Sequence, residues 1–162
     1  MTRRVQLVGI GTGEEKYEWF LRGLQERFGR QVSVNLCFSA DLANLVYAAS
    51  DLYLMPSKSE PCGLSQLMAM RFGAVPVVNA TGGLKDTVPA YEGPESEGRG
   101  FTFQSYNADD FLAAIDRALA LYYDAPAQWQ ELVRHDMSQD FGWDKGAEHY
   151  MALYRKALGD KA

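Results

Sequence analysis

The sequence predicts an α/β fold in which a parallel sheet is covered by helices on both faces. Short apolar runs alternate along the chain with stretches whose apolar residues recur at helical spacing, and this alternation is typical of parallel sheets. The apolar runs lack the every-second-residue polarity of a half-exposed strand, so both faces of each strand are expected to be buried. Because ligands bind such sheets at the carboxyl ends of the strands, we look for function in the loops that follow the strands.

The N-terminal part of the chain predicts three strands separated by two helices. A strand over 5–10 runs into the turn Gly11-Thr12-Gly13, and the helix that follows begins with acidic residues and ends at Gly29. The apolar residues of this helix share one face: Tyr17, Phe20, Leu21, Leu24 and Phe28. The other predicted elements are a strand over 32–36, a helix over 42–49 capped by Asp41, and a strand over 52–55 stopped by Pro56.

The C-terminal part continues the alternation and ends in helices. A polar segment over 91–98, punctuated by Gly and Pro, is expected to be an exposed loop. The predicted elements are a helix over 63–72, a strand over 75–78, a weaker strand over 100–103, a helix capped by Asn107, and C-terminal helices over 126–137 and 143–158.

Composition limits the classes of function. The 162 residues, 47% hydrophobic and 23% charged, are expected to form one globular domain with its own core. The net charge is −5 and the basic residues are scattered, which disfavours nucleic acid as a partner. No apolar run is long enough to span a membrane, and the start Met1-Thr2-Arg3-Arg4-Val5 lacks the apolar core of a secretory signal. Cys37 and Cys62 are expected to be reduced, which favours a cytoplasmic protein.

The loop 56–65 is the strongest candidate for chemistry. It joins a predicted strand to a predicted helix, and Gly63 lets a ligand approach the backbone. The amides of Leu64 and Ser65 at the helix start form an anion site. Glu60 offers a carboxylate that binds sugar hydroxyls or supports developing positive charge. A solvated loop with a helix cap is an equally weighted alternative.

Other motifs give weaker signals. Thr81-Gly82-Gly83 follows the next strand and predicts a second backbone nest for an anion, although such a turn is more often only a turn. The three glycines at 9, 11 and 13 do not have the spacing of a dinucleotide fingerprint. His135 and His149 lack the spacing of metal ligands, so no metal is expected.

A long segment resembles the signature of bacterial glycogen synthases and plant starch synthases. The run from Ser57 to Val78 contains the core E-P-C-G-L, and T-G-G-L-K-D-T-V follows from Thr81. Supporting matches lie at Gly11-Thr12-Gly13, at 47–52 and at Phe141-Gly142-Trp143, so the resemblance covers nearly the whole chain.

The resemblance implies a retaining glucosyltransferase of the GT-B type, with two Rossmann-like domains facing each other across a cleft. Such enzymes transfer glucose from ADP-glucose, or UDP-glucose in some members, to an α-1,4-glucan without a metal or other cofactor. Residues 1–162 correspond to part of the C-terminal domain, which holds the nucleotide sugar. The N-terminal domain, with its acceptor-side loop and catalytic histidine, is absent from the sequence.

The resemblance also implies roles for single residues. Glu60 corresponds to the active-site glutamate that contacts the donor glucose, and Cys62, Gly63 and Leu64 line the sugar pocket. The Leu64 and Ser65 amides, with the Ser65 hydroxyl, hold the diphosphate. Phe38 corresponds to an aromatic residue that stacks on the adenine, with a buried loop anchor as an equally weighted alternative.

Two departures refine these expectations. Related glycosyltransferases of the sucrose or lipid type carry a second glutamate where this chain has Met68, which favours the synthases. The first strand–helix unit of the C-terminal domain, which supplies two cations to the diphosphate, is also absent. By family topology its strand lies between the 5–10 and 52–55 strands, so we expect exposed strand edges and self-association, and no catalysis by the chain alone. A stand-alone nucleotide- or glucan-binding module is the alternative function.

Overall fold

The computed structural model describes residues 4–159, except for the side chain of Lys145. Residues 1–3, part of the N-terminal segment interpreted above, lie outside the described residues. The chain forms two compact units, Met1–Ser50 and Asp51–Ala162. Every strand pair is parallel, which confirms the predicted class.

The first unit contains a two-stranded sheet and two helices. Strand β1 (Leu7–Ile10) pairs with β2 (Val32–Asn35), and helix α1 (Glu15–Phe28) packs against β2. Helix α2 (Ala40–Ala49) begins two residues earlier than predicted. Its cap is Ser39, whose hydroxyl accepts a hydrogen bond from the Leu42 amide at 3.2 Å. The predicted cap, Asp41, lies instead in the first turn, where its charge complements the helix dipole.

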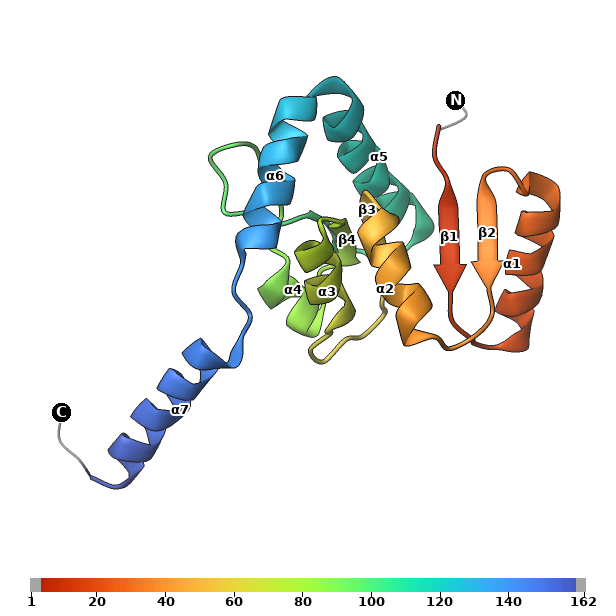
Figure 1. Cartoon of the computed structure of the whole chain (residues 1–162). Coiled ribbons are helices and arrows are strands. Elements are labelled where there is room, and N and C mark those ends of the chain that lie inside the picture. The colour runs from red at the N-terminus through yellow and green to blue at the C-terminus, as the bar shows by residue number, and fades with distance from the viewer. Residues whose placement is uncertain (1–3, 160–162) are drawn as a thin grey trace. The chain divides into compact units, whose positions relative to one another are not determined.

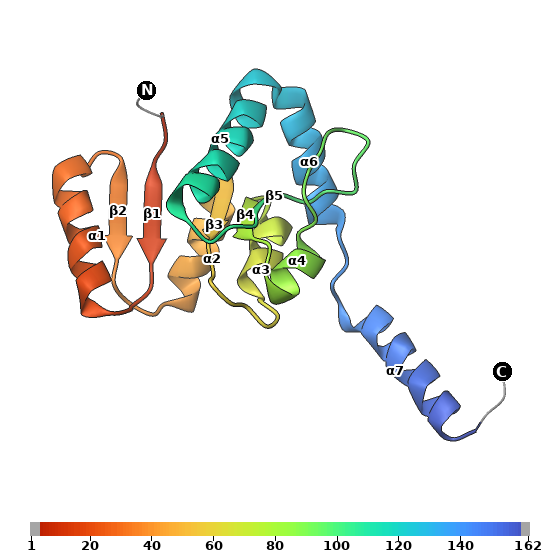
Figure 2. The same cartoon turned by 180° about the vertical axis from the view of Figure 1, so that it is seen from behind.

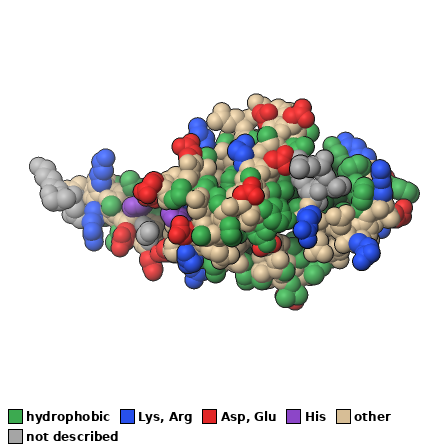
Figure 3. All heavy atoms as spheres, turned by 90° about the horizontal axis from the view of Figure 1, so that it is seen from above, with side chains coloured by type: hydrophobic (Ala, Val, Ile, Leu, Met, Phe, Trp, Pro, Cys, Tyr) green, Lys and Arg blue, Asp and Glu red, His purple; other side chains and the backbone are tan. Residues whose placement is uncertain are grey.

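The first unit exposes much of its apolar surface. Neither α1 nor α2 has a buried residue. On the predicted apolar face of α1, Phe20 is 63% exposed, and Val8 on β1 is 45% exposed. Figure 3 shows hydrophobic side chains spread over one face of the molecule, among charged ones of both signs.

The second unit is a three-stranded parallel sheet with helices on both faces (Figures 1 and 2). The strand order is β3-β4-β5, so β4 is central. The elements are β3 (Leu52–Met55), α3 (Ser65–Phe72), β4 (Val75–Asn79), α4 (Gly82–Thr87), β5 (Phe101–Phe103), α5 (Ala108–Asp124), α6 (Pro126–Ser138) and α7 (Trp143–Ala157). The predicted cap of α5 is confirmed, since the Asn107 side chain accepts from the Asp110 amide at 2.8 Å.

The core lies on both faces of β4, as its unbroken apolar run predicts. Val75 and Val77 pack on one face against Ala114 and Trp129 of α5 and α6. Val78 packs on the other face with residues of α3 and α4. Every residue of β4 is buried, so the loop that follows this strand starts from a fully packed element.

The structure corrects two expectations. The strands form two separate sheets, β1-β2 and β3-β4-β5, where the sequence predicted one. The absent strand that the resemblance implies stays a prediction. The segment from Gly82 is the helix α4 with Thr81 as its N-cap, where the sequence favoured a simple turn or nest.

Candidate functional site

The loop after β3 ends at the open N-terminus of α3. Leu64 is the N-cap of this helix and has no side-chain capping bond. The first intrahelical hydrogen bond runs from the Met68 amide to the Leu64 carbonyl at 3.0 Å. The amides of Leu64 and Ser65 precede this donor, so the helix itself does not use them. Leu64 is an exposed residue and Ser65 a partly exposed one, and unused amides at a helix start are the groups that bind anions.

A second loop, residues 80–83 running into the start of α4, is packed against the first by backbone contacts. The Gly83 amide donates to the Glu60 carbonyl at 3.1 Å. A side chain on Gly82 would collide with the Glu60 carbonyl, and one on Gly83 would collide with Cys62. Gly82 also has a φ of +47°, a conformation that side chains disfavour. The two loops are thus held at a separation that only glycines allow, and the predicted site residues of both come together.

Three polar residues that the sequence analysis did not select hold these loops. The Asn79 side chain, at the end of β4, donates to the Ser57 carbonyl at 2.8 Å and fixes the start of the first loop. Gln66 and Thr87 bind each other and the backbone of both loops. The sequence signal for Gln66 is a polar side chain at a position that helical spacing places in the core. Thr87 gave no such signal, because α4 was not predicted.

Three predicted site residues at the first loop and the start of α3 differ in their surroundings. The Ser65 hydroxyl donates to the sulfur of Met55 at 3.4 Å, so its role at a diphosphate stays a prediction. Cys62 is an exposed free thiol. Glu60 is half-buried, while its carbonyl is bound by Gly83.

Phe38 belongs to the first unit and is 95% exposed. The alternative that Phe38 is a buried loop anchor is therefore wrong. An exposed ring on a loop after a parallel strand is available for stacking, and its role at the adenine stays a prediction.

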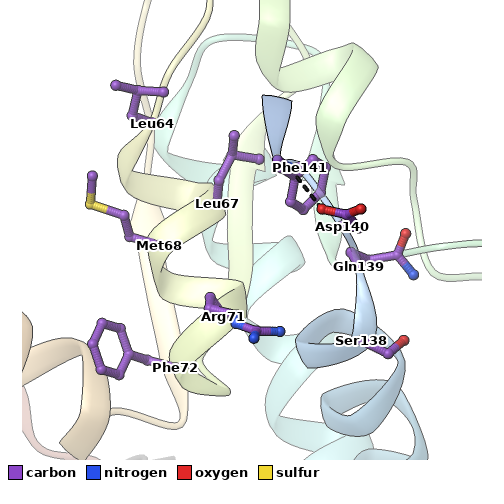
Figure 4. Close-up of a pocket in the computed structure, with 10 residues that line it drawn as sticks. Leu64, Leu67, Met68, Arg71, Phe72, Ser138, Gln139, Asp140 and Phe141 are labelled. Carbon is purple, nitrogen blue, oxygen red and sulfur yellow. Dashed lines mark hydrogen bonds between the residues drawn. The ribbon is translucent and has the colours of Figure 1, made fainter. Parts of the chain in front are cut away.

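An open cleft of about 600 Å³ lies beside α3 (Figure 4). One wall carries Leu64, Leu67, Met68, Arg71 and Phe72 of α3, and the other is the segment 138–142 after α6. Arg71 joins the walls, because its guanidinium donates to the Met137 carbonyl at 2.7 Å. Of the predicted site residues, Leu64 lines this cleft, so the candidate site is the pair of loops and not the cleft as a whole.

A buried carboxyl lies on α6, apart from these loops. Asp136 is 2% exposed, and neither of its carboxyl oxygens has a hydrogen-bond partner among the described residues. Burial raises the pKa of Asp136 to about 8, and the positive charge of Arg99 opposes part of that rise. We assign this group no role in the site.

Two further features are absent from the described part of the chain. Residues 4–159 contain no group of three His, Cys, Asp or Glu side chains arranged to hold a metal ion. None of the described helices is both long and apolar enough to cross a membrane.

Comparison with known proteins gives consistent matches. Residues 1–136 match the family model described as "Glycosyl transferases group 1". Glycogen synthase of Kosmotoga olearia is 46% identical over 158 residues, which are 98% of this chain and 33% of that protein. Glycogen synthase of Clostridium botulinum strain Alaska E43 is 47% identical over 152 residues, which are 94% of this chain and 32% of that protein.

A solved structure agrees with these relatives. The catalytic domain of starch synthase IV from Arabidopsis thaliana, bound to ADP and acarbose, is similar with a TM-score of 0.77 and 30% identity. The similarity covers 98% of this chain and 39% of that one. The chain spans about one third of the length of the curated relatives it matches.

Proposed function

The chain belongs to the group 1 glycosyl transferase family, and on that premise we propose that it is the donor-binding part of a glycogen or starch synthase. The observation that carries the proposal is the N-terminus of α3, where the helix does not use the Leu64 and Ser65 amides, on the loop that also carries Glu60. Helix N-termini bind phosphates through such amides and through the helix dipole. Similarity to glycogen synthases over nearly the whole chain supports the assignment.

The proposed chemistry is the transfer of glucose from a nucleoside diphosphate sugar. The Leu64 and Ser65 amides bind the diphosphate and stabilise the negative charge that develops on it as the glycosidic bond breaks. Glu60 lies beside the glucose, where its carboxylate stabilises the positive charge that develops at the anomeric carbon. Cys62 and Gly63 form the wall of the sugar pocket.

ADP-glucose is the proposed donor and UDP-glucose the alternative. The similar starch synthase structure holds ADP, which supports an adenine nucleotide, and Phe38 is the proposed stacking partner of the base. The proposed acceptor is an α-1,4-glucan, bound by parts of the full-length enzyme outside this chain. We therefore expect the chain alone to bind donor without transferring glucose, because many transition-state contacts are missing.

Calorimetric titration of the chain with ADP, ADP-glucose and UDP tests this function. We expect weak binding of ADP, with a Kd of about 1 mM, since only a few hydrogen bonds hold the diphosphate. Glu60→Gln should leave the affinity for ADP unchanged and remove the additional affinity that the glucose provides. Glu95→Gln, in the exposed loop 91–98, is the matched control and should change neither. The proposal would be refuted if the chain bound none of the three nucleotides.

A further inference from the structure

The side chain of Gln66 is fully buried beneath the loop 60–64. Its amide nitrogen lies 3.2 Å from the Cys62 carbonyl oxygen and 3.1 Å from the Gly63 carbonyl oxygen. It also lies 3.1 Å from the hydroxyl oxygen of Thr87 on α4. One side chain thus joins the backbone of the first loop to the helix that follows the second.

The bonds to Gln66 determine where the loop amides point. In a planar trans peptide the C=O and N–H bonds point in opposite directions. The Gly63 carbonyl belongs to the same peptide unit as the Leu64 amide, and the Cys62 carbonyl to the same unit as the Gly63 amide. The two hydrogens of the Gln66 NH₂ group serve three acceptors, so one hydrogen is shared. Because both carbonyls accept from this buried group, the Gly63 and Leu64 amides point away from it.

Thr87 fixes the orientation of the Gln66 amide. The Thr87 hydroxyl donates to the Gly83 carbonyl at 2.7 Å, so it can only accept from Gln66. This arrangement places the NH₂ group of Gln66 toward the loop carbonyls. The result is a continuous chain of hydrogen bonds from the first loop through Gln66 and Thr87 to the second.

The oxygen of the same amide has no hydrogen-bond partner among the described residues. A buried acceptor without a partner costs folding free energy, which an apolar side chain of similar length would avoid. The hydrogen bonds from the amide nitrogen offset part of this cost, and they fix the geometry of the loop. The Gln66 amide group, its oxygen first, also leaves no room for a side chain on Gly63, whose φ is +73°.

We propose that Gln66, oriented by Thr87, is a positioning residue that aims the Leu64 amide at the phosphates of the donor and the Gly63 amide at the sugar pocket. The inference rests on the proposed function and extends it to two residues that need not touch the ligand. It differs from a purely structural role because removal of the Gln66 amide should impair phosphate binding more than folding.

The test compares four variants of the chain. Gln66→Met removes the amide and keeps the side-chain length, and Gln130→Met makes the same exchange at an exposed position of α6. Thr87→Val removes the hydroxyl, and Thr87→Ser restores it. Each variant is titrated with ADP by calorimetry, its thermal unfolding is measured, and its backbone amide shifts are recorded by nitrogen-15 NMR.

We expect Gln66→Met to weaken ADP binding about tenfold, the size of one hydrogen bond to a charged group, while the fold is retained. The amide signals of Gly63 and Leu64 should shift more than those of β4. Thr87→Val should weaken binding in the same direction, and Thr87→Ser and Gln130→Met should resemble the parent chain.

The outcomes separate this inference from the proposed function. A folded Gln66→Met chain that binds ADP within twofold of the parent would overturn the inference. If the parent binds no nucleotide, the proposed function fails, and unchanged Gly63 and Leu64 signals in Gln66→Met would overturn the positioning role as well. If Gln66→Met does not fold, Thr87→Val is judged by the same criteria of affinity and amide shift.

Discussion

The rings of Tyr122 and Trp129 meet edge-on, with their centroids 5.2 Å apart and their planes at 82°. Tyr122 lies on α5 and Trp129 on α6, so this contact joins the two helices that cover one face of the sheet. Trp129 is 3% exposed and belongs to the main hydrophobic core. Edge-to-face pairs of this kind add to the stability that burial provides.

Trp129→Ala should therefore destabilise the chain strongly. A buried tryptophan replaced by alanine loses about 3–5 kcal/mol of unfolding free energy, because the cavity is only partly refilled. Trp143→Ala is the matched control, since Trp143 is 80% exposed and its removal should change stability little. Urea denaturation followed by circular dichroism measures both. Equal effects of the two substitutions would show that the α5–α6 face is not the core.

The Asp136 carboxyl predicts an unusual dependence of stability on pH. Its pKa in the folded chain is about 8, far above the ordinary value of 3.8. Between these values the unfolded chain releases the proton while the folded chain keeps it, so stability falls as pH rises. The expected slope is roughly 1 kcal/mol per pH unit, and the fall should end near pH 8.

Asp136→Asn should remove this slope, because an amide does not titrate. Denaturation at pH 5 and pH 8 should show a smaller loss of stability in the variant than in the parent, and a more stable variant at pH 8. Asp124→Asn replaces an exposed carboxyl on α5 and is the control. A variant that loses as much stability as the parent would show that another group causes the fall.

The sequence predicts correctly the features that are determined by residues only a few positions apart. The strand over 52–55 and the cap at Asn107 are confirmed because an apolar run and a capping side chain act within a few residues. Helix α4 was not predicted, because two glycines disfavour a helix. Its Gly83 instead gains a bond to the Glu60 carbonyl from a distant loop.

The candidate site shows the same division. Glu60 and the amides after it could be selected from the order strand, glycine-containing loop, helix. Gln66 could not be selected, because its partner Thr87 lies 21 residues away in the sequence. The role of a buried side-chain amide can be recognised only when its hydrogen-bond partners in the folded chain are known.

Self-association of the isolated chain is expected from its first unit. Val8 is 45% exposed on β1, and Trp19 and Phe20 on α1 are 70% and 63% exposed. Apolar surface beside strand edges promotes pairing between chains. Light scattering should give an average mass above that of one chain, rising with concentration, and Val8→Lys should lower it. A monomer at all concentrations, with ordinary thermal stability, would contradict this expectation.

Gly83→Ala should separate the two loops of the candidate site. A Cβ atom at this position would lie 2.5 Å from the Cys62 carbonyl oxygen and 2.6 Å from its Cα. Both are backbone atoms, so the overlap can be relieved only by moving the loop that carries Glu60 or the start of α4 apart from each other. Overpacking of this kind costs about 1–3 kcal/mol, and the displaced loop should also lose affinity for ADP.

Gly146→Ala, within α7, meets only an ordinary contact at 3.6 Å with the Trp143 ring, and alanine is the better helix former there. This control should keep or raise stability, so equal thermal midpoints and equal ADP affinities for the two variants would show that the contact between Gly83 and Cys62 does not hold the site together.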